Sequence, residues 1–202
     1  MPSISGQDYF AVFGLGRRLE LDLADLEKRF YRLSRQWHPD NFYRAAKAEQ
    51  EASLDQAARL NDAYRTLRDP FARAEYLLNL EGRQVEMKGS GVPPELLAEV
   101  FELSEWLADL RAPAPEPAQR APRHEVQAQL LRAKANLEKR LETLLAELQT
   151  LFTRWDQAMG AGHPQSARVE ISQGMGQVLA QRKYLQNVVS DISTALEGSA
   201  AR

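Results

Sequence analysis

The sequence contains no cysteine among its 202 residues. This absence excludes disulfide bonds, metal sites built on thiolates and catalysis by a thiol nucleophile. It also fits a reducing compartment. Residues 1–6 lack the basic and apolar regions that a signal peptide carries, so we expect a cytoplasmic protein.

Long apolar runs and a strong net charge are absent as well. No apolar stretch approaches the roughly 18 residues that a membrane-spanning helix needs. The formal net charge is only −2, so no global field draws the chain to nucleic acid or to an anionic membrane. The three histidines are far apart, and no nucleophile or metal-ligand spacing accompanies them. We therefore expect no membrane, nucleic acid, metal or cofactor binding and no enzymatic activity.

Helical periodicity is what the sequence does contain. Hydrophobic residues make up 44% of the chain and charged residues 27%, which is typical of a folded protein. Apolar residues recur at helical spacing from Asp22 to Trp37 and from Ala46 to Arg68. These segments predict an antiparallel helical hairpin, with the short segment 9–13 over its open side. Pro39 ends the first of these helices, and Asp69-Pro70 ends the second.

The second half of the chain predicts three longer helices, over residues 95–110, 123–159 and 166–196. Four prolines in residues 112–122 predict an extended connector between the first two. The leucines of the long middle helix follow a heptad spacing that would suit a coiled-coil dimer, but packing within one chain accounts for them more simply. No segment alternates as a strand. The prediction is an all-α monomer with a small hairpin domain at 1–78, a linker at 79–94 and a three-helix bundle at 95–202.

The tripeptide His38-Pro39-Asp40 stands between the two hairpin helices. One interpretation is a plain turn, in which Asp40 folds back onto the backbone. The preceding helix favours a second interpretation, because its polar face is basic. Four cations lie opposite the apolar stripe or on its flank: Lys28, Arg29, Arg32 and Arg35. A basic face that leads into a rigid, exposed turn predicts a docking site for an acidic partner.

Several motifs resemble a J-domain. They are Asp8-Tyr9-Phe10 with Phe13-Gly14-Leu15, the run Arg35-Gln36-Trp37-His38-Pro39-Asp40, and Leu60-Asn61-Asp62-Ala63-Tyr64 with Asp69-Pro70. The next run, Arg73-Ala74-Glu75-Tyr76-Leu77-Leu78, is similar to that of the HscB family, the co-chaperones of iron–sulfur cluster assembly. The resemblance implies that residues 1–78 are a J-domain and that the two domains form an L shape.

The resemblance also implies a role for the turn. In J-domains it binds a DnaK-type ATPase chaperone, here of the HscA type, and stimulates ATP hydrolysis by that partner. His38, Pro39 and Asp40 match the family motif directly, and Arg29 and Arg35 stand at matching basic positions. With Lys28 and Arg32 they make up the expected chaperone-binding set. Asn41 stands where the family often has lysine, so one cation beside the turn is missing and affinity for the chaperone is expected to be lower.

The helix over residues 95–110 has more apolar surface than one buried stripe explains. Its expected core face consists of Leu96, Val100, Leu103, Leu107 and Leu110. Leu97, Phe101 and Ala108 form a second stripe about 100–140° away around the helix. Either both stripes are buried, or the second is an exposed docking surface with an acidic rim.

The family resemblance favours docking, because the matching helix binds the IscU-type scaffold that carries nascent clusters. The scaffold contacts that it implies are Leu97, Ala98, Phe101, Glu102, Glu105 and, on the last helix, Tyr184. Ala98 replaces a larger apolar residue of the family, so some contact area is lost there. The expected function is an adaptor that brings the scaffold to the chaperone and stimulates its ATPase. The alternative is a J-domain adaptor for a different client that is unrelated to iron–sulfur clusters.

Overall fold

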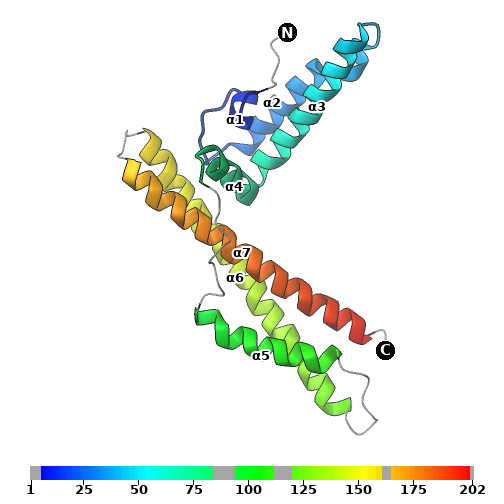
Figure 1. Ribbon diagram of the computed structural model, residues 1–202, viewed down its shortest axis with the longest axis vertical. Coiled ribbons are helices and arrows are strands. Elements are labelled where there is room, and N and C mark those ends of the chain that lie inside the picture. The colour runs from blue at the N-terminus through cyan, green and yellow to red at the C-terminus, as the bar shows by residue number, and fades with distance from the viewer. Residues whose placement is uncertain (1–5, 84–93, 112–119, 161–164, 201–202) are drawn as a thin grey trace. The chain divides into compact units, whose positions relative to one another are not determined.

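The computed structural model describes residues 6–83, 94–111, 120–160 and 165–200, and all regular elements in these ranges are helices (Figure 1). The all-α prediction is therefore confirmed. The α-helices are α1 (Tyr9–Val12), α2 (Leu23–Gln36), α3 (Lys47–Arg68), α4 (Pro70–Leu80), α5 (Pro94–Arg111), α6 (Arg120–Gly160) and α7 (Gln165–Ala200). A 3₁₀ turn, η1 (Pro39–Phe42), follows α2. No helix in the described ranges is both long and apolar enough to cross a membrane.

Local sequence signals explain where the first helices begin and end. The Asp22 carboxylate accepts hydrogen bonds from the N–H groups of Ala24 and Asp25, and so caps the start of α2. Gly14 follows α1 with a positive φ of 63°, a conformation that glycine adopts without strain. These boundaries agree with the predicted helices to within one or two residues.

Helix α4 is not among the helices that the sequence predicts, because the pattern indicates only that Asp69-Pro70 ends α3. The same pair also starts α4. The Asp69 carboxylate accepts a hydrogen bond from the N–H of Ala72 at 2.7 Å, and Pro70 occupies the first helical position. Proline suits this position because its fixed φ is helical and its missing N–H has no intrahelical acceptor.

Contacts between residues divide the chain into two compact units. The first contains residues 1–84 together with 148–175, and the second contains 85–147 together with 176–202. Each long helix of the C-terminal half therefore contributes to both units. This packing differs from the predicted bundle at 95–202, in which α6 and α7 belong wholly to the second domain. The expected L shape stays a prediction.

In the first unit, α2 and α3 lie side by side as the predicted hairpin, and α1 packs against α3 (Figure 1). Phe30 of α2 and Tyr64 of α3 stack with ring centroids 4.3 Å apart. Leu148, Phe152 and Trp155 of α6 are buried in this unit. Helix α7 approaches α6 closely at Gly174, where an added Cβ would lie 3.2 Å from the Leu151 side chain.

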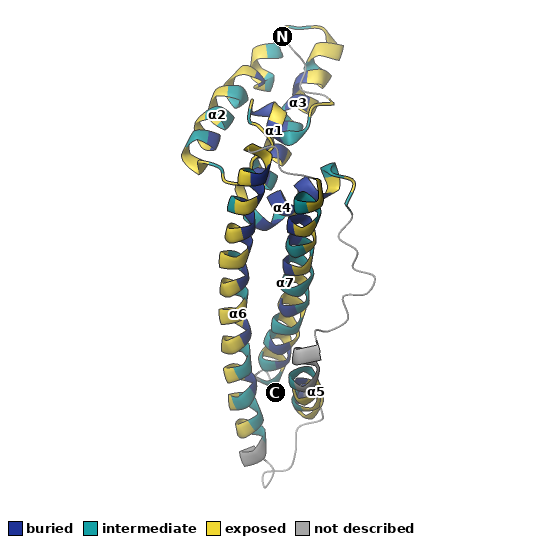
Figure 2. Cartoon of the chain, turned by 90° about the vertical axis from the view of Figure 1, so that its left-hand side faces the viewer, coloured by how far each residue is buried: buried dark blue, intermediate teal, exposed yellow. Residues whose placement is uncertain are grey.

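In the second unit, α5 packs with the other segments of α6 and α7. In Figure 2, which colours the ribbon by burial, the buried residues of α6 and α7 lie along the sides of the two helices that face each other. The buried core contains Leu103, Leu107, Leu110, Leu130, Leu137, Leu144, Val178, Leu185 and Ile192. The heptad leucines at 130, 137 and 144 are thus buried within the chain, as the simpler interpretation predicted.

The predicted connector at 112–122 is only partly tested. Residues 112–119 lie outside the described part of the chain, whereas α6 begins at Arg120. The prediction of an extended conformation is therefore wrong for residues 120–122. Pro122 lies in the first turn of α6, where a missing N–H disrupts no intrahelical hydrogen bond.

Candidate functional site

The turn at His38 is exposed and held by short-range hydrogen bonds. The N–H of Asp40 donates to His38 Nδ1 at 3.3 Å, and the N–H of Asn41 donates to the His38 carbonyl at 2.9 Å. The His38 side chain is 55% exposed and the Asp40 side chain 88% exposed. His38 Nδ1 also lies 3.4 Å from a carboxylate oxygen of Asp40, so two contacts hold the imidazole beside that residue.

The same turn is anchored to the end of α2. The Asn41 side-chain amide donates to the Arg35 carbonyl at 2.7 Å, which satisfies one of the unpaired carbonyls at the helix end. Trp37 is buried, and its ring stacks with that of Phe42 at 6.3 Å between centroids. Asn41, which stands where the family often has lysine, therefore fixes the turn to the helix, although it adds no charge.

The basic side chains of α2 divide into two groups. Lys28, Arg32 and Arg35 are exposed, as expected for a surface that meets a partner. Arg29 is half-buried and binds within the unit. It donates to the Asp25 carboxylate at 2.8 Å and to the Phe13 carbonyl at 2.9 Å, so its guanidinium connects α2 to the end of α1.

Tyr31 belongs to this surface, although the sequence prediction did not select it. It is exposed and lies four residues before Arg35 and three after Lys28, so the three side chains neighbour each other on α2. An aromatic residue outside the apolar stripe of an amphipathic helix is the signal that would have identified it.

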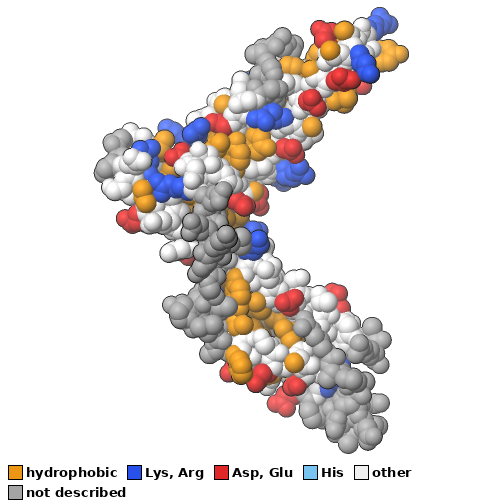
Figure 3. All heavy atoms as spheres, viewed as in Figure 1, with side chains coloured by type: hydrophobic (Ala, Val, Ile, Leu, Met, Phe, Trp, Pro, Cys, Tyr) orange, Lys and Arg blue, Asp and Glu red, His pale blue; other side chains and the backbone are white. Residues whose placement is uncertain are grey.

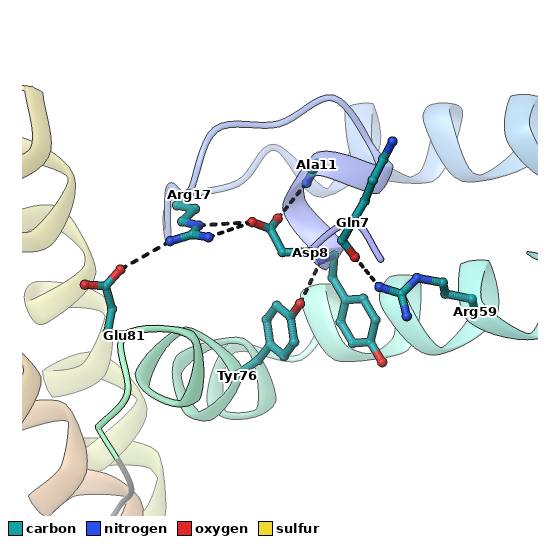
Figure 4. A network of polar contacts seen from close by, with 8 residues as sticks. Gln7, Asp8, Ala11, Arg17, Arg59, Tyr76 and Glu81 are labelled. Atoms are coloured by element: carbon teal, nitrogen blue, oxygen red, sulfur yellow. Dashed lines mark hydrogen bonds and ion pairs between the residues drawn. The ribbon is translucent and has the colours of Figure 1, made fainter. Parts of the chain in front are cut away.

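A polar and aromatic network holds α1 against the other helices of the first unit (Figure 4). The Tyr9 ring stacks on Tyr76 at 4.4 Å, and the Tyr9 N–H donates to the Tyr76 hydroxyl at 2.8 Å. The Arg59 guanidinium lies over the Tyr9 ring, 5.5 Å from its centroid, and donates to the Gln7 carbonyl. Burial raises the pKa of Tyr76 above its ordinary value, and the hydrogen bond from Tyr9 opposes that rise.

Arg17 extends this network at the exposed edge. Its guanidinium pairs with the Asp8 carboxylate at 3.0 Å and with Glu81 at 3.5 Å (Figure 4). Asp8 also accepts from the Ala11 N–H and so caps α1. The motif Asp8-Tyr9-Phe10 therefore supports the fold of the unit that presents His38.

On α5 the two apolar stripes have different environments. Leu103, Leu107 and Leu110 are buried, whereas Phe101 is 66% exposed. Glu102, Glu105 and Ala108 are exposed as well. On the face drawn in Figure 3, hydrophobic side chains gather over α5 with acidic side chains along their edge. For Phe101 and Ala108 the structure thus favours the interpretation in which the second stripe is exposed over the one in which both stripes are buried. Leu97 and Ala98 lie outside the residues whose side chains the structure describes.

Tyr184 of α7 is half-buried in the second unit. Burial raises its pKa, and the negative charge of Glu99 on α5 raises it further. Glu99 also forms an ion pair with Arg140 of α6 at 2.7 Å. Tyr184 is therefore influenced by the charge of Glu99, which lies on the helix that carries Phe101.

The described residues contain no group of three or more His, Asp or Glu side chains placed to hold a metal ion. The structure assembles two exposed regions from the predicted site residues. One is the turn of His38 and Asp40 with the cations of α2. The other is the exposed stripe of α5, an apolar side chain with carboxylates beside it.

Comparisons with known proteins identify relatives of this chain. The family model of the DnaJ domain matches residues 8–76. The co-chaperone protein HscB homologs of two Vibrio cholerae strains are 42% identical over 113 residues, which is 55% of this chain. The aligned segment spans 66% of the length of these relatives.

Solved structures extend the similarity over most of the chain. The chaperone HscB from Vibrio cholerae has a TM-score of 0.65 at 27% identity, over 92% of this chain and 96% of that one. The human co-chaperone protein HscB has a TM-score of 0.64 at 22% identity, over 94% and 82% of the two chains, and supports the fold alone. With its DnaJ domain and the helices that follow, the chain is similar to the HscB co-chaperones over most of its length.

Proposed function

We propose that this protein is a co-chaperone, which stimulates the ATPase of an HscA/DnaK-type chaperone and delivers an IscU-type iron–sulfur scaffold to it. The observation that carries the proposal is the exposed His38 and Asp40 pair at the end of the basic helix α2, within a DnaJ domain. In this role the chain catalyses no reaction and needs no cofactor. A cytoplasmic location is part of the proposal.

The chaperone side works through charge and geometry. Lys28, Arg32 and Arg35 attract an acidic surface of the chaperone, and long-range attraction of this kind raises the association rate. The turn then presents the His38 imidazole and the Asp40 carboxylate in a fixed arrangement. Arg29 acts indirectly, because its bonds to Asp25 and Phe13 hold α2 on the unit.

The client side is the exposed stripe of α5. Desolvation of the Phe101 ring supplies binding energy, and Glu102 and Glu105 select a partner with complementary donors or cations. Binding of both partners to one chain raises the local concentration of the scaffold at the chaperone. The alternative, a different client, differs only in this second half and keeps the same chaperone contact.

A reconstituted ATPase assay tests the proposal. We expect ATP hydrolysis by a purified HscA-type chaperone to rise with this protein, and to rise further when an IscU-type scaffold is added. The scaffold should also bind the protein directly in a calorimetric titration. Stimulation without scaffold binding would establish the alternative client, and absence of stimulation would contradict the proposal as a whole.

A further inference from the structure

A groove of about 230 Å³ lies between α5 and α6 in the second unit. Its α5 wall includes Glu102, Leu103 and Trp106, and its α6 wall includes Gln129, Arg132 and Asn136. The volume is below the roughly 300–1,000 Å³ of sites that enclose small molecules or cofactors. It suits one or two side chains of a polypeptide.

Two side chains of opposite charge line this groove without forming an ion pair with each other. Glu102 on α5 and Arg132 on α6 are both exposed, and neither forms an ion pair within the described part of the chain. Glu99 and Arg140, a second pair across the same two helices, are joined at 2.7 Å. The groove therefore keeps an acceptor on one wall and a donor on the other.

Trp106 supplies the apolar part of the groove. It is half-buried, next to the buried Leu103, and no described residue accepts a hydrogen bond from its indole N–H. Indole combines a large apolar face with one polar group, which is why tryptophan is common at the centres of protein interfaces.

The groove is continuous with the scaffold surface proposed above. Glu102 belongs to both, and Trp106 follows Phe101 by five residues, about 140° around the helix. Glu99, which also lines the groove, interacts electrostatically with Tyr184. A partner that contacts Phe101, Glu102 and Tyr184 therefore lies over or beside the groove.

We propose that the groove binds an extended segment of the scaffold polypeptide. A peptide group offers an N–H to the Glu102 carboxylate and a carbonyl to the Arg132 guanidinium, and so matches both walls at once. A free ion satisfies only one of them. An aliphatic side chain of the same segment covers the Trp106 indole. The inference rests on the proposed function, and it extends the scaffold surface around α5 from Phe101 to Trp106.

Affinity for a purified IscU-type scaffold tests the groove. We expect Arg132→Ala and Trp106→Leu each to weaken binding about 5–30-fold, the range of substantial interface residues. Leu131→Ala is the matched control, because Leu131 is 55% exposed beside Arg132 but does not line the groove. Arg132 is exposed, so its substitution tests the proposal even if the tryptophan variant loses stability. Wild-type affinity in the Arg132→Ala variant would overturn it.

Quenching of tryptophan fluorescence by acrylamide separates this inference from the proposed function. The difference between wild type and Trp106→Phe reports on Trp106, and we expect saturating scaffold to protect it from the quencher. If Phe101→Ala weakens binding while Trp106 remains quenchable, the groove proposal fails and the scaffold function stands. If the wild type binds no scaffold, both fail. Protection that grows with the concentration of the protein alone would make the groove a contact between copies and would also overturn the proposal.

Discussion

The Asp156 carboxylate of α6 accepts a hydrogen bond from the backbone N–H of Leu19 at 2.8 Å. Its second oxygen accepts from the N–H of Glu20 at 2.9 Å. One side chain near the end of α6 thus satisfies two successive N–H groups of the segment between α1 and α2. Trp155 adds a further bond there, from its indole N–H to the Arg17 carbonyl at 3.4 Å. The J-domain unit is therefore stabilised by residues more than 130 positions away in the sequence.

Replacement of Asp156 by alanine should destabilise this unit by about 1.5–2 kcal/mol. The estimate is the lower part of the range for hydrogen bonds to charged groups, because the bond from Glu20 is exposed to solvent. Urea unfolding followed by tryptophan fluorescence measures the change. The neighbouring exposed Gln157→Ala should stay within about 0.5 kcal/mol of wild type. Equal effects of the two substitutions would contradict the role of Asp156.

This relationship also shows where prediction of the fold from sequence reached its limit. Amphipathic periodicity identified α2, α3, α5, α6 and α7, because each has an apolar stripe long enough to define its period. The stripe of α6 shows that Trp155 is buried but not what covers it. Helix α4 is short and rich in buried residues, among them Phe71, Leu77 and Leu78, so it has no clear polar face to reveal its period.

His38→Gln should abolish stimulation of the chaperone ATPase and leave scaffold affinity unchanged. Glutamine retains an oxygen that can accept a hydrogen bond from the Asp40 N–H, so the turn persists. It lacks the imidazole that we propose the chaperone contacts. The ATPase assay and a scaffold titration measure the two effects separately. His124→Gln is the control, since His124 is an exposed histidine of α6 in the other unit. Full stimulation by the His38 variant would remove the turn from the mechanism.

Substitutions of the exposed Arg32 and of the half-buried Arg29 on α2 should separate effects on chaperone binding from effects on stability. Arg32→Ala removes an exposed cation, so we expect weaker chaperone binding with a smaller dependence on salt, at a stability within about 0.5 kcal/mol of wild type. Arg29→Ala breaks the bonds to Asp25 and Phe13 and should cost about 1 kcal/mol of folding free energy. Chaperone titrations at low and high salt, together with urea unfolding, measure both. An Arg32 variant that loses as much stability as the Arg29 variant would contradict the assignment of Arg32 to the exposed chaperone-binding surface.

Exposure of a site residue could be predicted from sequence where one segment contains the whole feature. His38 and Asp40 flank one proline in the chain, so the exposure of both side chains follows from the turn itself. Arg29 lies on the flank of the apolar stripe, an angular position that is compatible with solvent or with burial, and only the position of Phe13 decides between them. Trp106 had no such local signal, because the groove that it lines requires α6 as its other wall.

The half-buried hydroxyl of Tyr76 should make stability decrease at alkaline pH. Burial raises its folded pKa above the unfolded value of 10.0, so the folded state holds the proton more tightly. The resulting stabilisation is present below pH 10.0 and is lost as the pH rises through the raised pKa. Tyr76→Phe should cost about 1 kcal/mol at neutral pH, because the Tyr9 N–H loses its acceptor, and should reduce the alkaline decrease. Thermal unfolding across this pH range checks both, with the exposed Tyr43→Phe as control.

Phe101→Ala should weaken binding of the scaffold about 10–30-fold, because the exposed ring is the apolar centre of a surface with an acidic edge. Stability should change little, since a side chain that is 66% exposed leaves no cavity in the core. Leu54→Ala is the control, as it removes an exposed apolar side chain from α3 in the other unit. Calorimetric titration with the scaffold measures the affinity, and urea unfolding measures the stability. Unchanged affinity would point to a different client, whereas a large loss of stability would show that Phe101 belongs to the core of the bundle.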